Sequence, residues 1–407
     1  MPSPARAPAY HDTALPMRTH QPKVALLIET ARGYGRGLLR GIVRCSRLHG
    51  GWAFYITPGD FEQALPEMRQ WGGTGIIARL ETPRIAEAVL ATGLPLVALD
   101  LSDAQLSDGS PLAGVAEVRS DSPGAARLAA EHLLDRGFRQ YAYVGVARRV
   151  WSRRRQEGFV ARLAEAGLDC HVYPQPRRKR DREWGREQAT LAAWLRDLAK
   201  PVGVMACNDD RGRQVLEACR AAGVRVPEEA AVIGVDNDEL LCDLSTPPLS
   251  SVALNTERGG FEAAALLDAL MHGRPAAGQR IVVEPLRVET RQSTDVLAVE
   301  DREVADALRH IRDRAAEPVQ VVDVVRAAGL SRRALEMRFR RAVGRSIHQE
   351  IQRVHLDRAT HLLMETDLPT ARVAEAAGFS SPSYFGKVFR RQMGVTPAGY
   401  RTHVRAR

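Results

Sequence analysis

The chain has 407 residues, of which 44% are hydrophobic and 26% are charged, and it carries a formal net charge of +9. This length corresponds to roughly two to four domains, and the composition excludes a wholly disordered chain and a collagen-like or coiled-coil fibre. No window approaches the roughly 18 uninterrupted apolar residues of a membrane span, so the sequence predicts a globular protein that does not cross a membrane.

The first 22 residues are rich in proline and have no apolar central run. They therefore predict a disordered tail and not a secretory signal, and we expect the chain in the cytoplasm. Its five cysteines show no CxxC spacing and no Cys/His cluster. In a reducing compartment such cysteines are expected to be small core residues, not disulfides or zinc ligands.

Apolar runs of five to seven residues alternate with amphipathic stretches over the next 270 residues or so. The runs lie at 24–28, 75–80, 94–100, 141–146, 201–207 and 230–236, and the helix-like stretches at 37–48, 83–93, 122–137, 153–167 and 210–223. This alternation is typical of parallel strands that crossover helices bury on both faces. The length exceeds one such sheet, so we predict a doubly wound α/β body of two lobes with a ligand cleft between them.

The positive charge is concentrated in the last quarter of the chain. Residues 301–407 hold 20 Lys and Arg against 12 Asp and Glu, whereas residues 1–300 hold 38 against 37. This asymmetry indicates a nucleic-acid-binding end on a nearly neutral body, although a solvated basic tail would give the same count. We predict a body at 23–290, a linker at 291–300 and a helical domain at 301–407.

Within this basic end, one pattern occurs twice, at 321–344 and 371–394. In each copy a short helix-like segment ends at a glycine, Gly329 or Gly378, and a serine, Ser331 or Ser381, then opens a second helix. Glycine supplies a left-handed turn, and serine caps the free amides of the following helix. The pattern predicts two helix-turn-helix units.

The second helix of each unit has an apolar pair at i and i+4, Leu335 with Phe339 and Phe385 with Phe389, which we expect to face the core. The opposite faces would then enter the major groove of DNA. The side chains on these faces are Arg332, Arg333, Glu336, Met337 and Arg340 in the first unit, and Ser383, Tyr384, Lys387 and Arg391 in the second.

Between the units, a predicted helix of about 20 residues would span roughly 30 Å, close to the ~34 Å between successive major-groove faces. The alternative is a helical bundle that merely packs. The segment GFSSPSYFGKVFRRQMGVTPAGYR at 378–401 resembles the AraC family of bacterial regulators, and the resemblance covers both units and the connecting helix. It implies that base readout is dominated by the first unit, where Arg can pair with guanine and Glu with cytosine.

Residues 23 to about 290 resemble the sugar-binding domain of the LacI/GalR repressors and the periplasmic sugar-binding proteins. The matching segments include VRSDSPGAARLAAEHLLDRGFRQYAYVGV at 118–146 and VRVPEEAAVIGVDNDELL at 224–241. A LacI-like body followed by an AraC-like domain is similar to the family of xylose operon regulators, as is ETARGYGRGLLRGI at 29–42.

This resemblance implies a sugar site at the ends of the strands. Paired charged groups suit sugar hydroxyls, which both donate and accept, and an aromatic ring suits the ring carbons. The implied residues are Asp236, Arg155, Asn208, Asp209 and Trp151 on one lobe, and Glu29, Arg32, Tyr34 and Arg36 on the other. A surface or helix-capping role is the alternative for each of them.

No Walker sequence, HExxH or GxSxG is present, and the GxGxG at 33–37 departs from the dinucleotide-binding spacing. We therefore expect no enzyme, no cofactor and no metal. The expected protein is a sugar-responsive transcription factor, with D-xylose the leading effector by resemblance, acting as a homodimer on promoter DNA and, as an activator, on RNA polymerase. Another sugar, a repressor role, a transport-type binding protein and a sugar-metabolising enzyme are the alternatives.

Overall fold

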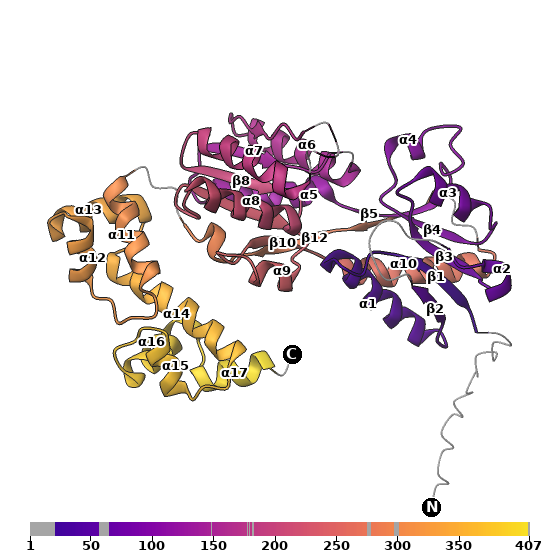
Figure 1. Cartoon of the computed structure of the whole chain (residues 1–407). Helices are drawn as coiled ribbons and strands as arrows, with labels where there is room; N and C mark the ends of the chain where they lie inside the picture. The colour runs from indigo at the N-terminus through magenta and orange to yellow at the C-terminus, as the bar shows by residue number, and fades with distance from the viewer. Residues whose placement is uncertain are drawn as a thin grey trace, which may run out of the picture.

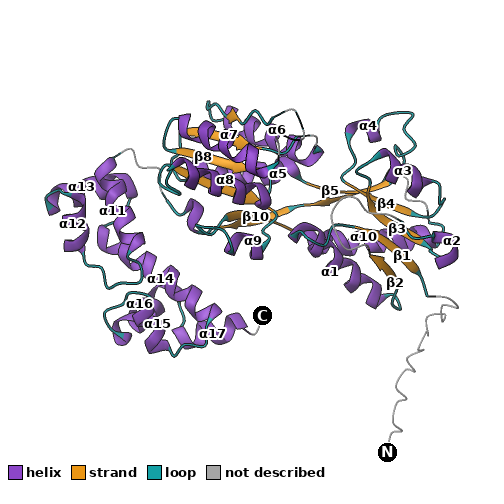
Figure 2. Ribbon diagram, in the orientation of Figure 1, coloured by secondary structure: helices purple, strands orange, loops and turns teal. Residues whose placement is uncertain are grey.

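The computed structural model describes residues 21–56, 65–147, 149–176, 178, 180, 183–274, 278–296 and 301–405. Apart from its last two residues, the predicted tail at 1–22 lies outside these ranges. The described residues form two α/β lobes and a C-terminal helical domain (Figures 1 and 2). This arrangement confirms the predicted fold class.

The first lobe is built on a six-stranded sheet with strand order β11-β5-β4-β3-β1-β2, whose neighbours all pair in parallel. Its strands are β1 (Lys23–Leu27), β2 (Ala53–Ile56), β3 (Gly75–Arg79), β4 (Leu96–Leu99), β5 (Ala116–Ser120) and β11 (Arg280–Val283). Its helices are α1 (Gly33–Leu48), α2 (Met68–Trp71), α3 (Pro83–Leu90), α4 (Asp103–Leu106) and α10 (Thr256–Met271). The predicted runs 24–28, 75–80 and 94–100 are thus strands of this sheet.

The second lobe has a sheet with strand order β12-β10-β9-β8-β6-β7, parallel except for the antiparallel edge strand β12. Its strands are β6 (Gln140–Val144), β7 (His171–Val172), β8 (Val202–Ala206), β9 (Ala230–Val235), β10 (Ser250–Leu254) and β12 (Pro285–Glu289). Its helices are α5 (Ser122–Leu134), α6 (Val150–Ala164), α7 (Trp184–Asp197), α8 (Asp209–Ala222), α9 (Glu239–Asp243) and the short 3₁₀ helix η2 (Gln292–Thr294).

The chain crosses between the lobes after β5, after β10 and after β11. The crossing segments are hydrogen-bonded to one another: the Asp121 amide donates to the Val283 carbonyl, and the Asn255 amide donates to the Glu284 carbonyl, both at 2.9 Å. Three adjacent crossings form a hinge about which the lobes can open and close. The carboxyl ends of both sets of parallel strands face the space beside this hinge.

The C-terminal domain contains α11 (Arg302–Asp313), α12 (Val321–Ala328), α13 (Arg332–Val343), α14 (Ile347–Glu365), α15 (Thr370–Ala376), α16 (Pro382–Met393) and α17 (Pro397–Arg405). Two separate cores lie at either end of α14, which joins them (Figure 1). The predicted connecting helix is therefore present, with 19 residues.

The start of the predicted linker, 291–300, belongs to the second lobe, because η2 packs on β9 and β10 and its Ser293 and Thr294 are fully buried. Residues 297–300 lie outside the described ranges. We propose the domain boundary there. Of the helices that the structure describes, none combines the length and apolar character needed to cross a membrane.

Candidate functional site: a cavity between the lobes and two helix-turn-helix units

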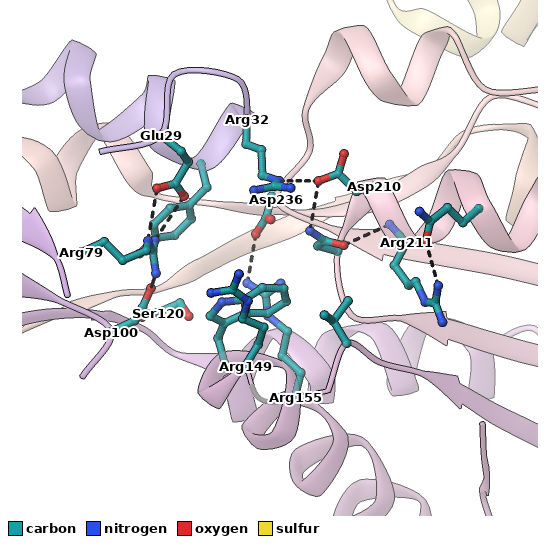
Figure 3. A pocket seen from close by; sticks show the side chains of 15 residues that line it. Glu29, Arg32, Arg79, Asp100, Ser120, Arg149, Arg155, Asp210, Arg211 and Asp236 are labelled. Atoms are coloured by element: carbon teal, nitrogen blue, oxygen red, sulfur yellow. Dashed lines mark hydrogen bonds and ion pairs between the residues drawn. The ribbon is translucent and has the colours of Figure 1, made fainter. Parts of the chain in front are cut away.

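A cavity of about 180 Å³ lies between the two lobes, beside the hinge (Figure 3). Drug-sized ligands occupy sites of roughly 300–1,000 Å³, so this cavity suits a smaller molecule. Its lining is dominated by charged side chains from both lobes. The lining residues are Glu29, Arg32, Tyr34, Arg79, Asp100, Ser120, Val146, Arg149, Trp151, Arg155, Asn208, Asp210, Arg211, Gln214 and Asp236.

On the first lobe, the buried Arg79 at the end of β3 holds two carboxylates at the cavity wall. Its guanidinium donates to both oxygens of Glu29 at 3.2 and 3.3 Å, and to Asp100 at 2.6 Å. Burial opposes the charge on Arg79, but the two carboxylates outweigh it and raise the pKa of the guanidinium. One cation against two anions leaves carboxylate lone pairs for hydroxyl donors of a ligand.

Tyr34 completes this wall, with its ring 5.7 Å from the Arg79 guanidinium carbon. Its hydroxyl is buried and has no hydrogen-bond partner among the described residues. Burial, followed by the neighbouring Asp100, raises the pKa of this hydroxyl well above its usual value, so it is a neutral donor and acceptor. A buried hydroxyl without a partner is costly unless a ligand pairs with it.

On the second lobe, Arg155 donates to Asp236 at 3.0 Å and to the Cys207 carbonyl at 2.5 Å. The Trp151 ring lies over the same guanidinium, 5.2 Å from its central carbon. Burial raises the pKa of Asp236 to about 6, although Arg155 acts in the opposite direction. A charged pair beside an indole ring offers both the polar and the apolar contacts that a sugar presents.

Two carboxylates of this cavity sit on unusual backbone. Asp236 has φ 106° and Asp100 has φ 49°, each immediately after a buried strand. Non-glycine residues rarely adopt positive φ, and where they do the strain is commonly found at functional sites. This conformation places both carboxylates at the carboxyl ends of their strands, on the cavity.

Ion pairs join the lobes around the cavity. Arg32 of the first lobe donates to Asp210 of the second at 2.5 Å. Asn208, 6% exposed, lies beside Asp210 and also caps α8 by accepting from the Arg211 amide. Asn208 therefore lines the cavity, as predicted, and also caps a helix, which was the alternative role considered for it.

Seven of the nine residues predicted for the sugar site line the cavity, and two do not. Arg36 instead donates to Asp238 across the lobes at 2.7 and 2.8 Å. Asp209 is buried behind the cavity, where it accepts from the Asp238 amide at 2.7 Å and from the Ser251 hydroxyl at 2.5 Å. Both residues hydrogen-bond to Asp238 and neither lines the cavity, so the structure corrects the prediction that they belong to its lining.

The sequence prediction missed several lining residues, namely Arg79, Asp100, Ser120, Arg149, Arg211, Asp210 and Gln214. One available signal was Arg79 itself, a charge within an otherwise apolar strand. Another was Asp100, the polar end of the run 94–100. In the described ranges no group of three or more His, Cys, Asp and Glu side chains is arranged to hold a metal ion.

In the C-terminal domain, both repeated segments fold as helix-turn-helix units. Gly329 and Gly378 have φ 66° and 78°, and Ser331 and Ser381 accept from the amides of Ala334 and Tyr384. Leu335, Phe339, Phe385 and Phe389 are all fully buried, as predicted.

The predicted reader side chains lie on the other faces of α13 and α16. Arg332, Arg333, Met337 and Arg340 are exposed and Glu336 is half-buried in the first unit; Ser383, Tyr384, Lys387 and Arg391 are exposed in the second. Two of the four readers of the second unit are also held by α14, because Gln352 donates to the Tyr384 hydroxyl at 2.5 Å and accepts from Arg391 at 3.4 Å. No sequence pattern indicated this tie.

Comparisons with known proteins agree with this arrangement. Residues 23–117 match a family described as the XylR N-terminal domain, 130–294 a periplasmic binding protein-like domain, and 324–403 a helix-turn-helix domain. The chain is 32% identical over 389 residues to the xylose operon regulatory protein of Escherichia coli K12, covering 95% of this chain and 98% of that protein. It is 31% identical over 385 residues to that of Haemophilus influenzae, covering 93% and 98%.

Among solved structures, that of the xylose-binding transcription activator XylR matches with a TM-score of 0.76 and 31% identity, covering 94% of this chain and 98% of that one. A LacI family regulator of Enterococcus faecium with bound ribose matches 67% of the chain with a TM-score of 0.53 and 24% identity, and so shares the fold of the body. On the strength of the full-length matches, this chain belongs to the family of xylose operon regulatory proteins.

Proposed function

We propose that the chain is a D-xylose-responsive activator of transcription that works in the cytoplasm. The observation that carries the proposal is the cavity itself: two charged clusters, Glu29–Arg79–Asp100 and Arg155–Asp236, face each other from different lobes of one chain that ends in two helix-turn-helix units. Full-length relatives named for the xylose operon support D-xylose as the sugar.

In this proposal the sugar bridges the two lobes. Its hydroxyls donate to the carboxylates of Asp236 and Asp100, and accept from Arg155 and the Tyr34 hydroxyl, while its ring carbons lie against Trp151. Because contacts come from both lobes, the sugar binds the closed state better than the open one, which is the condition for a switch. Moving a population from 1:99 to 99:1 requires about 5.5 kcal/mol of such preference.

The output is the placement of α13 and α16 on DNA. The 19-residue α14 spans about 28 Å at 1.5 Å per residue, so the two units can reach successive major-groove faces of one duplex. Arg332, Arg333, Glu336 and Met337 would read bases, and Arg340, Ser383, Tyr384, Lys387 and Arg391 would mainly hold phosphates. A homodimer and contact with RNA polymerase complete the proposal.

Calorimetric titration with pentoses and hexoses tests the sugar half. Saturable binding of D-xylose by the wild-type protein, lost in Asp236→Ala, is the expected result. Binding of a different sugar at the same site would correct the effector. A protein that shifts promoter DNA yet binds none of the sugars would overturn the effector class.

The DNA half is tested with Arg333→Ala in electrophoretic shifts at several salt concentrations. Losing one bidentate base contact costs about 1–3 kcal/mol, so affinity for the operator should fall roughly 5- to 150-fold while sugar binding persists. Arg258→Ala is the matched control, because it removes the same charge from an exposed pair with Glu262 on the first lobe. Equal effects of the two substitutions would mean that net charge, and not base readout, governs binding.

Sedimentation with operator DNA tests the dimer, and transcription in vitro with purified RNA polymerase tests activation. Transcription is expected to rise when D-xylose is added. A fall in transcription on adding D-xylose would identify a repressor instead.

A further inference from the structure

A second, larger cavity of about 510 Å³ adjoins the first on the side of α4 and α6. Its wall is mixed, and its polar side chains include Ser102 and Asp103 from the first lobe and Gln156 and Gln175 from the second. Of the described residues that line these two cavities, Val146 and Arg149 are the two that line both. They form the partition between the candidate sugar site and its neighbour.

Arg149 is the charged part of this partition. It is the last residue before α6, and its guanidinium reaches across the lobes to pair with Glu81, which follows β3. The two side chains are 28% and 13% exposed. Figure 3 shows the Arg149 side chain beside Arg155, pointing toward the cavity. An ion pair across the lobes therefore closes the site on this side.

The partition determines how large a ligand the site accepts. With it in place, the site has about 180 Å³; without it, the site would open into the 510 Å³ space and reach the size range of much larger ligands. The polar groups of the second cavity would then meet any substituent that extends from the sugar ring. A protein can separate related ligands by a clash with the wrong one as well as by contacts with the right one.

We propose that the Arg149–Glu81 pair is a size gate that restricts the site to a sugar without an exocyclic hydroxymethyl group or a second ring. The inference rests on the proposed function, since it concerns the specificity of the same sugar site. D-Glucose is a direct probe, because in its ring form it differs from D-xylose by one hydroxymethyl group. Xylobiose, which adds a second xylose ring, is the larger probe.

The test is calorimetric titration of wild-type protein, Arg149→Ala and Arg153→Ala with D-xylose, D-glucose and xylobiose. Arg153 is the matched control: it lies in the first turn of α6, lines the second cavity but not the first, and also pairs across the lobes, with Asp103. In Arg149→Ala the ratio of D-xylose to D-glucose affinity is expected to fall at least about tenfold, mainly by a gain for glucose, the lower end of what one methylene-sized difference contributes. In Arg153→Ala the ratio should equal that of the wild type.

An unchanged ratio in Arg149→Ala, or an equal fall in both variants, overturns the gate while leaving the sugar site intact. A wild-type protein that binds none of the three sugars overturns the proposed function, and the gate with it. Should Arg149→Ala unfold in a thermal scan, Glu81→Ala carries the same test, because it releases Arg149 and keeps α6 unchanged. Its ratio is expected to move in the same direction by a smaller factor.

Discussion

Asp236 combines a strained backbone with a buried carboxylate whose pKa burial raises to about 6. In the proposed complex the ionised carboxylate accepts hydrogen bonds from sugar hydroxyls and forms an ion pair with Arg155. Protonation of the carboxylate weakens both interactions. Sugar affinity should therefore be constant above pH 7 and fall as the pH drops through 6. Well below the pKa, the ionised fraction and the affinity that depends on it fall about tenfold per pH unit.

Titrations with D-xylose between pH 5 and pH 8 measure this dependence. Asp236→Asn is the control: it should bind weakly and show no such fall. For stability without sugar the sign is opposite, because a raised pKa means that the folded state holds the proton more tightly. The contribution of Asp236 to the free energy of unfolding therefore rises as the pH falls from 6 toward 3.8, the ordinary pKa of an aspartate. A wild-type affinity that stays flat from pH 5 to pH 8 would refute the role given to Asp236.

Single residues of the site were predictable where a strand end identified them. Asp236 and Asn208 follow apolar runs, and the carboxyl ends of parallel strands are where such folds bind ligands. Arg79 escaped prediction because its role comes from Glu29 and Asp100, which neighbouring strands bring to it. Asp209 and Arg36 were misplaced because each contacts Asp238, which lies 29 positions from Asp209 and 202 positions from Arg36 in the sequence.

At the level of elements, long apolar runs identified β1, β3, β4, β6, β8 and β9, whereas the other six described strands were missed, β5 and β10 among them. Strand β5 contains Glu117, and β10 opens with Ser250 and Ser251, yet all three are fully buried. The two serines satisfy their hydroxyls through the Arg291 carbonyl and Asp209. Buried polar side chains with tertiary partners break the apolar pattern, so sequence alone does not reveal such strands.

The two copies of the helix-turn-helix pattern differ at their glycines, and this gives a prediction. A methyl carbon at Gly378 would lie 2.6 Å from the Glu317 carbonyl oxygen and 2.7 Å from the imidazole Nε2 of His355, whereas one at Gly329 would meet nothing within 4 Å. Both glycines have positive φ, which costs a side chain about 1–2 kcal/mol. Gly378→Ala should therefore destabilise the domain by that amount plus about 1–3 kcal/mol of steric strain.

Urea unfolding of the full chain, followed by a probe in the C-terminal domain, compares Gly378→Ala with Gly329→Ala. The first variant should also lose affinity for operators that require both units, since the Gly378 turn sits against the 315–317 loop of the first unit. Equal destabilisation by the two substitutions would show that the contact with this loop does not position the second unit.

For the whole molecule, charge distribution along the chain correctly indicated where the DNA-binding end lies, but not how it meets the body. Arg312 of α11 pairs with Glu228 of the second lobe at 3.3 Å, and Arg353 of α14 pairs with Asp295 at 3.1 Å. Such pairs join residues from 58 to 84 positions apart, beyond the range of any local pattern. They tie the C-terminal domain to the second lobe, so that hinge closure moves the first lobe relative to both.

Closure itself depends on a contact that does not touch the cavity. Asp238 of the second lobe accepts from Arg36 and from the Gly33 amide of the first lobe, and Asp209 holds the Asp238 amide from behind. Gly33 is needed there because a side chain carbon would lie 2.9 Å from the Asp238 Cβ. If closure is what the sugar selects, weakening this contact should weaken sugar binding at a distance.

Asp238→Asn removes the charge and keeps the shape, so Arg36 loses its ion pair. Because Arg36 is about one-third exposed, the closed state should lose only about 1 kcal/mol, and D-xylose affinity should fall roughly fivefold in calorimetry. Arg40→Ala, which removes an exposed pair with Glu257 within the first lobe, should leave the affinity unchanged. Operator affinity without sugar should be equal in both variants, because the open state lacks the Arg36–Asp238 contact. An Asp238→Asn protein that binds sugar like the wild type would show that the lobes close without this contact.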